Sequence, residues 1–307
     1  MITKISTIGM TRAEWLEQRG GTIGGSDAGA ICGMNPYSSP YSVFAEKRKL
    51  IPPKEENEAM RQGRDLEQYV AQRFAEETGK KVRRDNSIIY NSDYPFAHAD
   101  LDRVVVGGDA GLECKTASPM NYAMYADGNY PEHYYVQCMH YMMVTGKSKW
   151  YLAVLVFQRG LFIFEINRDE AEIATLAEVE KAFYENNIKA GIEPPPDGSE
   201  ATTNALAERF PDSMDIKLDL TPCAAQIAMY LSLKEQEKAT KALIEEAANA
   251  IKAYMKDAER GEYGDHKVIW KNSKRSTFDK KRLAAEHPEI NLDDYTNQTQ
   301  SRKFTIS

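Results

Sequence analysis

Cysteine is scarce in this sequence, and its cysteines are scattered. The four positions are Cys32, Cys114, Cys138 and Cys223, and no two of them form a C-x-x-C pair. Zinc sites, iron–sulfur clusters and disulfide frameworks all depend on grouped cysteines. We therefore expect free thiols and none of these three features.

Long apolar segments are missing as well. The sequence has no run of 18 apolar residues, and its N-terminus lacks the apolar stretch of a secretory signal. We expect a soluble, cytoplasmic protein without membrane contact. The Gly-Gly pairs at 20–21 and 24–25 are not followed by Gly-Lys-Ser/Thr, so no ATP-binding loop is indicated.

Positive charge is not in excess. The chain has 39 basic and 46 acidic residues and a net charge of −7, which disfavours a protein that coats nucleic acid without specificity. A nuclease is compatible with this balance, because metal-binding carboxylates add negative charge. The most basic stretch covers 271–275 and 280–282 beside Trp270 and Phe278. It fits a DNA-binding face and a solvated surface about equally well.

Hydrophobic periodicity predicts an α/β core over residues 1–200. Leu66, Val70 and Phe74 recur at helical spacing, and Gly79 ends that helix. Further helices are expected at 43–49, 132–144 and 169–190, and strands at 88–90, 101–106, 112–116, 150–157 and 161–166. The last two strands should form a hairpin that turns at 158–160.

The composition changes after the Pro/Gly break at 194–198, so residues 201–307 are predicted to form a C-terminal extension. One long helix is expected over 221–260, followed by a basic, β-like tail that includes 267–269 and 303–306. The helix carries an apolar stripe at Ile227, Leu231, Leu243, Ala247, Ile251 and Tyr254. The stripe is interrupted around 236–240, so it indicates coiled-coil packing only weakly.

Three polar residues carry the chemistry. In a strand over 112–116, side chains alternate, so Glu113 and Lys115 share one face and Leu112 and Cys114 the other. A turn at 107–111 brings Asp102 beside them. Two carboxylates and one lysine suit Mg²⁺-assisted hydrolysis of a phosphodiester. On spacing alone, however, the pattern is weak, and a cross-strand ion pair on a solvated face is the favoured explanation.

Four motifs over residues 11–190 add to this pattern. They are Trp15…Arg19–Ala28 with Gly33–Tyr37, then Gly63–Glu67, then Leu101–Arg103 with Gly111–Thr116, and finally Tyr135–Gln137 with Tyr141–Gly146. In this order the sequence resembles the YqaJ-like viral recombinases, phage-type exonucleases related to the lambda exonuclease. The resemblance implies the PD-(D/E)XK nuclease core, a mixed central sheet flanked by helices.

The resemblance also implies roles for single residues. Asp102 and Glu113 match metal-binding carboxylates, and Lys115 matches the catalytic lysine. Glu67 matches an acidic residue that a helix delivers to the metal, and Gln137 a glutamine that orders the site. Taken without the resemblance, Glu67 is an ordinary exposed glutamate and Gln137 a polar residue beside an apolar helix stripe.

Arg19 and Ser26 match positions that contact phosphate, the arginine near the 5′ end. The chain departs from the family at Asp100, where relatives usually carry a small polar residue. Asp100 is either an extra carboxylate near the site or a solvent-facing residue, and we expect the latter. His98 is expected to be a structural histidine.

The function implied is a Mg²⁺-dependent (or Mn²⁺-dependent) 5′–3′ exonuclease that leaves 3′ single strands from double-stranded DNA ends. The resemblance further implies a ring-shaped homo-oligomer (a trimer), a single-strand annealing protein as partner, and a phage or prophage gene in a bacterial host. The alternatives are a PD-(D/E)XK endonuclease or a nuclease of other polarity, and an inactive DNA-binding or scaffold protein.

Overall fold

The computed structural model describes residues 1–297 and 302–306. The chain divides into two compact units, Met1–Pro211 and Asp212–Ser307. Helix α8 (Glu200–Arg209) lies in the first unit, although the sequence prediction begins the extension at 201. It packs on α3 (Pro40–Lys47), where Thr202 donates to the Ser39 hydroxyl at 2.8 Å.

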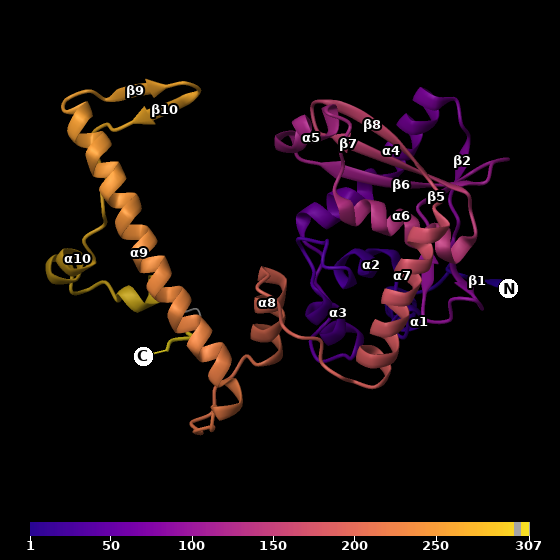
Figure 1. Cartoon of the computed structure of the whole chain (residues 1–307), viewed down its shortest axis with the longest axis horizontal. Helices are drawn as coiled ribbons and strands as arrows, with labels where there is room; N and C mark the ends of the chain where they lie inside the picture. The colour runs from indigo at the N-terminus through magenta and orange to yellow at the C-terminus, as the bar shows by residue number, and fades with distance from the viewer. Residues whose placement is uncertain (298–301, 307) are drawn as a thin grey trace. The chain divides into compact units, whose positions relative to one another are not determined.

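The first unit is built on a five-stranded mixed sheet (Figure 1). Its strands, in spatial order, are β2 (Val82–Arg83), β5 (Arg103–Val105), β6 (Ala110–Ala117), β7 (Lys149–Val156) and β8 (Gly160–Asn167). Strands β6 and β7 run parallel, and the other neighbours run antiparallel. The predicted α/β fold with a mixed sheet between helices is confirmed, and so is the hairpin between β7 and β8.

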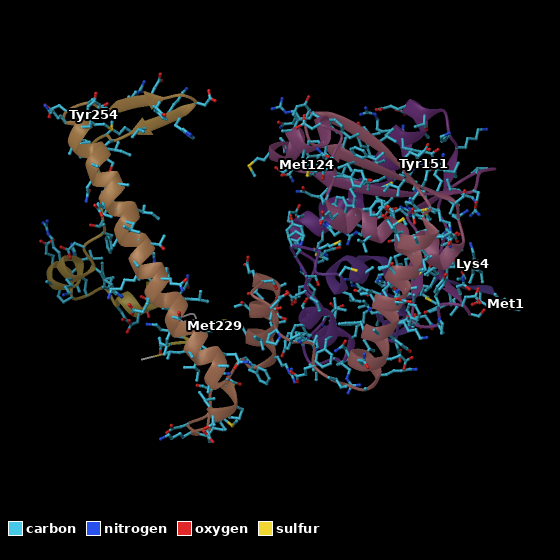
Figure 2. All side chains as sticks on the ribbon, in the orientation of Figure 1. Met1, Lys4, Met124, Tyr151, Met229 and Tyr254 are labelled. Carbon is cyan, nitrogen blue, oxygen red and sulfur yellow. The ribbon has the colours of Figure 1, made fainter. Side chains whose placement is uncertain are left out.

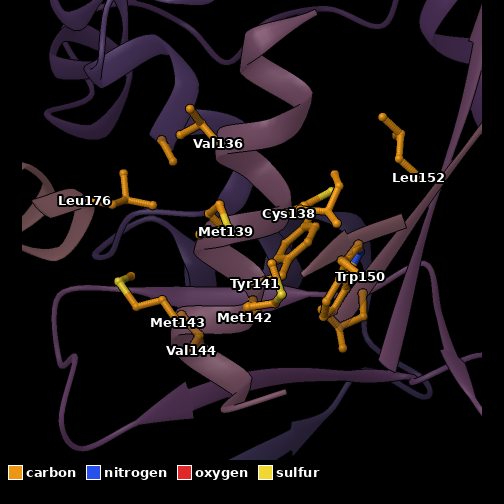
Figure 3. Close-up of a cluster of buried hydrophobic side chains, with 14 of the residues drawn as sticks. Val136, Cys138, Met139, Tyr141, Met142, Met143, Val144, Trp150, Leu152 and Leu176 are labelled. Atoms are coloured by element: carbon orange, nitrogen blue, oxygen red, sulfur yellow. The ribbon is translucent and has the colours of Figure 1, made fainter. Parts of the chain in front are cut away.

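Helices cover both faces of this sheet. On one face, α4 (Glu58–Thr78) packs Val70 and Phe74 against Leu112 and Cys114 of β6. On the other face, α6 (Glu132–Thr145) packs against β7, where Tyr141 lies beside Trp150 with ring centroids 5.2 Å apart (Figure 3). The alternation within β6 therefore separates a core-facing pair of residues from the polar pair at 113 and 115.

A smaller sheet supports the first helices. It consists of β1 (Ile2–Ser6), β3 (Ser87–Asn91) and β4 (His98–Asp100), all antiparallel. Strands β1 and β4 were not predicted, because β1 is mostly exposed and β4 has only three residues. Helix α1 (Arg12–Arg19) begins at a capping box of Thr11 and Glu14, and α2 (Gly25–Ile31) packs against α6.

The remaining elements of the first unit follow the sheet. Helix α5 (Tyr122–Ala126) comes after β6, and α7 (Glu170–Phe183) continues into a π-helical turn at Tyr184–Lys189. Together these last two segments fill the predicted helix at 169–190. All four cysteines are free thiols.

The second unit consists of α9 (Ala224–Met255), the hairpin β9 (Arg260–Tyr263) and β10 (His266–Ile269), and α10 (Lys280–Glu286). Side chains such as Met229 and Tyr254 project from α9 (Figure 2). The predicted β-like tail is wrong at 303–306, because residues 302–306 pair with no strand. Among the described residues, no helix is both long and apolar enough to span a membrane.

Candidate active site

Strand β6 presents Glu113 and Lys115 on the same face. The Lys115 Nζ atom lies 2.6 Å from Glu113 Oε1, and Glu113 is buried while Lys115 is partly exposed. Burial alone would lower the pKa of Lys115, but Glu113 and Asp102 raise it above its usual value. Lys115 is therefore stabilised as a cation by the buried carboxylate beside it.

Asp102 lies just before β5 and reaches across to β6. Its Oδ2 atom accepts the backbone N–H of Cys114 at 2.8 Å, in the antiparallel pairing of β5 with β6. Burial raises the pKa of Asp102 well above its usual value, and the carboxylates of Glu113 and Glu67 add to the rise. The turn at 107–111 thus brings Asp102 beside Glu113 and Lys115, as the sequence predicted. The single positive charge of Lys115 faces two carboxylates.

Helix α6 orients Glu113 from the other side. Gln137 is buried, and its Nε2 atom donates to Glu113 Oε1 at 2.9 Å and to the Tyr141 hydroxyl at 2.7 Å. Tyr134, one turn earlier, places its ring 5.0 Å from Lys115 Nζ. Gln137 is therefore a partner of the carboxylate and not a bystander beside an apolar stripe.

Glu67 comes from α4, and it is half-buried. It pairs with the buried Arg103 and lies 3.7 Å from Arg84 Nη2. Its carboxylate influences Asp102 electrostatically, so the helix does deliver it to this region. The interpretation of Glu67 as an ordinary exposed glutamate is wrong, because Arg103 forms an ion pair with its carboxylate at the edge of the site.

The residues present fit a divalent metal held by a small ligand set. Glu113 Oε2 is buried and has no hydrogen-bond partner, which leaves a hard oxygen ligand unused beside Asp102. Over 1–297 and 302–306, no group of three or more His, Cys, Asp or Glu side chains is arranged to hold a metal. Mg²⁺ commonly uses one or two carboxylates together with water and substrate phosphate, and this arrangement matches that pattern.

Arg19 and Ser26 line a cleft of about 1070 Å³ at the ends of α1 and α2. The guanidinium of Arg19 stacks 3.9 Å from the Trp15 ring centre. Its Nε atom lies 2.6 Å from Asp100 Oδ2 and donates to His98 Nε2 at 3.0 Å. The expectation of a solvent-facing Asp100 is therefore wrong, because this carboxylate is half-buried against an arginine.

His98 is fully buried, as a structural histidine should be. Since Nε2 accepts from Arg19, Nδ1 carries the proton and donates to the Thr22 hydroxyl at 2.8 Å. Burial and the nearby charge of Arg19 lower the pKa of His98 to about 2. The ring is neutral and fixes the orientation of the arginine.

Two glycines connect the cleft with the carboxylates. A Cβ atom on Gly24 would lie 3.0 Å from His98 Nε2, and one on Gly25 would lie 2.6 Å from the Tyr141 ring and 3.2 Å from Gln137. The backbone at the start of α2 therefore touches the partners of both sites. This close approach is the physical reason for Gly-Gly at 24–25.

Other candidates lie elsewhere. His140 is buried and bonds Glu180 at 2.7 Å, so it is engaged in the core and not in a zinc site with His133. The basic stretch at 271–282 belongs to the second unit, where Trp270 and Phe278 are exposed. Its role in DNA binding stays a prediction.

The sequence interpretation missed Tyr134, Tyr141 and Trp15 as site partners. Tyr134 and Tyr141 stand three and four residues from Gln137, and Trp15 stands four before Arg19. Residues at these spacings share a helix face. That spacing could have identified Tyr134 once Gln137 was chosen, whereas Trp15 and Tyr141 also stand within the motifs of the resemblance.

Three comparisons relate the chain to known proteins. A family model described as the YqaJ-like viral recombinase domain matches residues 14–148. The uncharacterized protein YqaJ of Bacillus subtilis is 36% identical over 302 residues, which cover 97% of this chain and 94% of that protein. The solved alkaline exonuclease LHK-Exo of Laribacter hongkongensis has a similar fold, with a TM-score of 0.50 and 23% identity over 59% of this chain and 94% of that chain.

Proposed function

Because this chain belongs to the YqaJ-like viral recombinase family, we propose that it is a metal-dependent 5′–3′ exonuclease acting on double-stranded DNA ends. The observation that carries the proposal is the unpartnered Oε2 atom of buried Glu113, next to Asp102 and Lys115. A buried carboxylate oxygen without a donor is costly unless a cation completes it. The name of the similar LHK-Exo structure, an alkaline exonuclease, agrees with the activity.

In this proposal Asp102 and Glu113 hold Mg²⁺ or Mn²⁺, with Glu67 at the edge of the same site. The bound metal would polarise the scissile phosphate and lower the pKa of the attacking water. Lys115 supplies a fixed positive charge for the charge that develops on the phosphate. Gln137 keeps Glu113 in one orientation through its 2.9 Å hydrogen bond.

Arg19 and Ser26 contact phosphate near the 5′ end of the DNA, in the cleft that both residues line. The exposed Ser26 offers a hydroxyl, and Arg19 offers the two Nη groups that its contacts with His98 and Asp100 leave over. The close contact of Gly24 and Gly25 with both sites would hold the terminal nucleotide in register with the carboxylates.

Resection in this direction leaves 3′ single strands that a single-strand annealing protein can use for recombination. We propose such a protein as partner, a homo-oligomeric ring (a trimer) as the active form, and a phage or prophage origin with action in the host cytoplasm. An endonuclease, a nuclease of other polarity and an inactive DNA-binding protein are the competing functions.

The first test digests linear duplex DNA labelled at the 5′ or the 3′ end, with Mg²⁺ and with EDTA. We expect rapid Mg²⁺-dependent loss of the 5′ label and retention of the 3′ label in long strands. Cutting of closed circular DNA would instead identify an endonuclease. Binding without cleavage in any divalent metal would support the inactive DNA-binding protein.

Two variants test the site. Asp102→Ala and Glu113→Gln should each reduce cleavage by about a thousandfold or more, because each removes a metal ligand. Glu165→Gln is the matched control, since Glu165 is an exposed carboxylate on β8 that pairs with Lys149. Far-UV circular dichroism checks the fold. Cleavage that survives Asp102→Ala would mean that the site is assigned to the wrong residues.

A further inference from the structure

Arg19, which we propose to lie near the 5′ end of the DNA, is already paired with a carboxylate within the protein. Arg19 Nε lies 2.6 Å from Asp100 Oδ2 and donates to His98 Nε2, and the Trp15 ring covers one face of the guanidinium. A guanidinium stays charged at physiological pH, and the Asp100 carboxylate lies directly against it. An incoming phosphate therefore meets an arginine whose charge a neighbouring carboxylate largely offsets.

Asp100 is held in this position by the backbone. It lies in β4, where its Cα pairs with Ile88 of β3, and its side chain is only 24% exposed. The neighbouring residue Ala99 is buried. A phosphate that displaced Asp100 would have to leave this carboxylate half-buried without its arginine, which is costly.

A second cation near the cleft is balanced in the same way. Lys47 Nζ lies 2.7 Å from Asp27 Oδ2 and donates to the Thr22 carbonyl. Around the whole cleft, five basic side chains stand against four acidic ones. A terminal phosphate monoester carries a charge of about −1.5 to −2 at neutral pH, so its favourable binding needs a clear positive excess. The cleft has only one more basic than acidic side chain, so it provides little net positive charge.

We propose that Asp100 is a specificity-determining residue that makes the enzyme nearly indifferent to a 5′ phosphate, so that 5′-hydroxyl ends are degraded as well as phosphorylated ones. The inference rests on the proposed exonuclease function. Asp100 acts through Arg19. It reduces the binding free energy that Arg19 gains from a terminal phosphate dianion, while the Nη groups of Arg19 still contact the internal phosphates and the 5′-terminal sugar. The chain thereby accepts ends left by breakage that carry no phosphate.

The test compares initial kcat/KM on the same linear duplex with a 5′ phosphate or a 5′ hydroxyl. We expect the wild-type ratio to lie within about threefold of one, and Asp100→Asn, which keeps the shape and removes the charge, to raise it about tenfold or more. A general loss of activity cancels in this ratio, which a purely structural role of Asp100 would leave unchanged. Asp93→Asn is the control, because Asp93 is an exposed aspartate in the turn between β3 and β4.

The double variant Arg19→Ala/Asp100→Asn tests whether the effect of Asp100 depends on Arg19. The gain from Asp100→Asn must disappear when Arg19 is absent. A wild-type preference for phosphorylated ends above about tenfold, or a ratio that Asp100→Asn leaves unchanged, would overturn the inference. If Asp100→Asn does not fold, the wild-type ratio and the smaller Asp100→Ser decide.

Failure of the proposed function gives a different result. In that case no Mg²⁺-dependent loss of the 5′ label occurs with either substrate. The charge argument is then tested by fluorescence anisotropy of the two duplexes in EDTA. Equal affinities that become unequal in Asp100→Asn support the role of Asp100, and a phosphate preference already present in the wild type contradicts it.

Discussion

The two units of this chain are stabilised in different ways. Every buried residue described lies within Met1–Pro211, and no described residue of Asp212–Ser307 is buried. In α9, apolar residues such as Leu243 remain 65% exposed, and ion pairs such as Lys241–Glu237 lie on its solvent-exposed surface. A site that needs fixed geometry can form only where packing fixes side chains, so the carboxylates lie in the first unit.

Removal of a leucine side chain is the strongest test of this difference. Leu152 in β7 is fully buried in the core cluster that includes residues of α6, whereas Leu243 in α9 is exposed. Leu152→Ala should lower the free energy of unfolding by about 2–5 kcal/mol, and Leu243→Ala by less than about 0.5 kcal/mol. Urea unfolding followed by far-UV circular dichroism measures both. Equal losses would show that α9 is packed as tightly as the central sheet.

A methyl group added to a glycine gives a smaller effect in the same sense. Gly25→Ala would place its Cβ 2.6 Å from the Tyr141 ring, whereas Gly261→Ala in β9 meets its nearest atoms at 3.9 Å. Gly25→Ala should cost about 1–3 kcal/mol of unfolding free energy and reduce cleavage, because Tyr141 shares Gln137 with Glu113. Gly261→Ala should change neither. Full activity in Gly25→Ala would mean that α2 can move away from α6 at no cost.

The smallest expected difference between the two units is in how the free energy of unfolding depends on pH. His98 has a folded pKa of about 2 against an ordinary value of 6.5, so below 6.5 only the unfolded chain binds this proton. Its contribution to stability is therefore present above pH 6.5 and is lost as the pH falls. Between pH 7.5 and 5.5 this loss is on the order of 1 kcal/mol.

His98→Gln should remove that part of the slope, and His287→Gln should leave it unchanged, since His287 is exposed in the second unit. Unfolding free energies at the two pH values give the slopes. A wild-type slope that persists in His98→Gln would assign the loss to other groups, of which the buried His140–Glu180 pair is the first to examine.

How much of the site the sequence could predict depends on the distance over which each contact forms. Glu113 and Lys115 share a strand face, and one short turn links them to Asp102, so strand alternation and this turn together placed the three residues. Arg19 and Asp100 are brought together by the small sheet, whose strands β1 and β4 have no clear pattern. The error at Asp100 followed from this, because the sequence of a three-residue strand does not indicate which distant residue its side chains contact.

The long helix shows the opposite case. The sequence predicted it over 221–260, and the structure has it at Ala224–Met255, because helix formation depends on neighbours within one turn. The sequence also predicts a β-like tail at 303–306. A strand requires a partner, however, and residues 302–306 have none in the described chain. Local patterns therefore served the helix and failed the tail.

By itself, the sequence determined the elements with local periodicity, the two faces of β6 and the motifs that place the chain in its family. Only the tertiary structure decided which charges meet: the clamp of Arg103 on Glu67, the unpartnered oxygen of Glu113 and the pairing of Arg19 with Asp100. The physical reason is that periodicity reports burial of a face, whereas the state of a charged group is set by neighbours that are distant in the sequence.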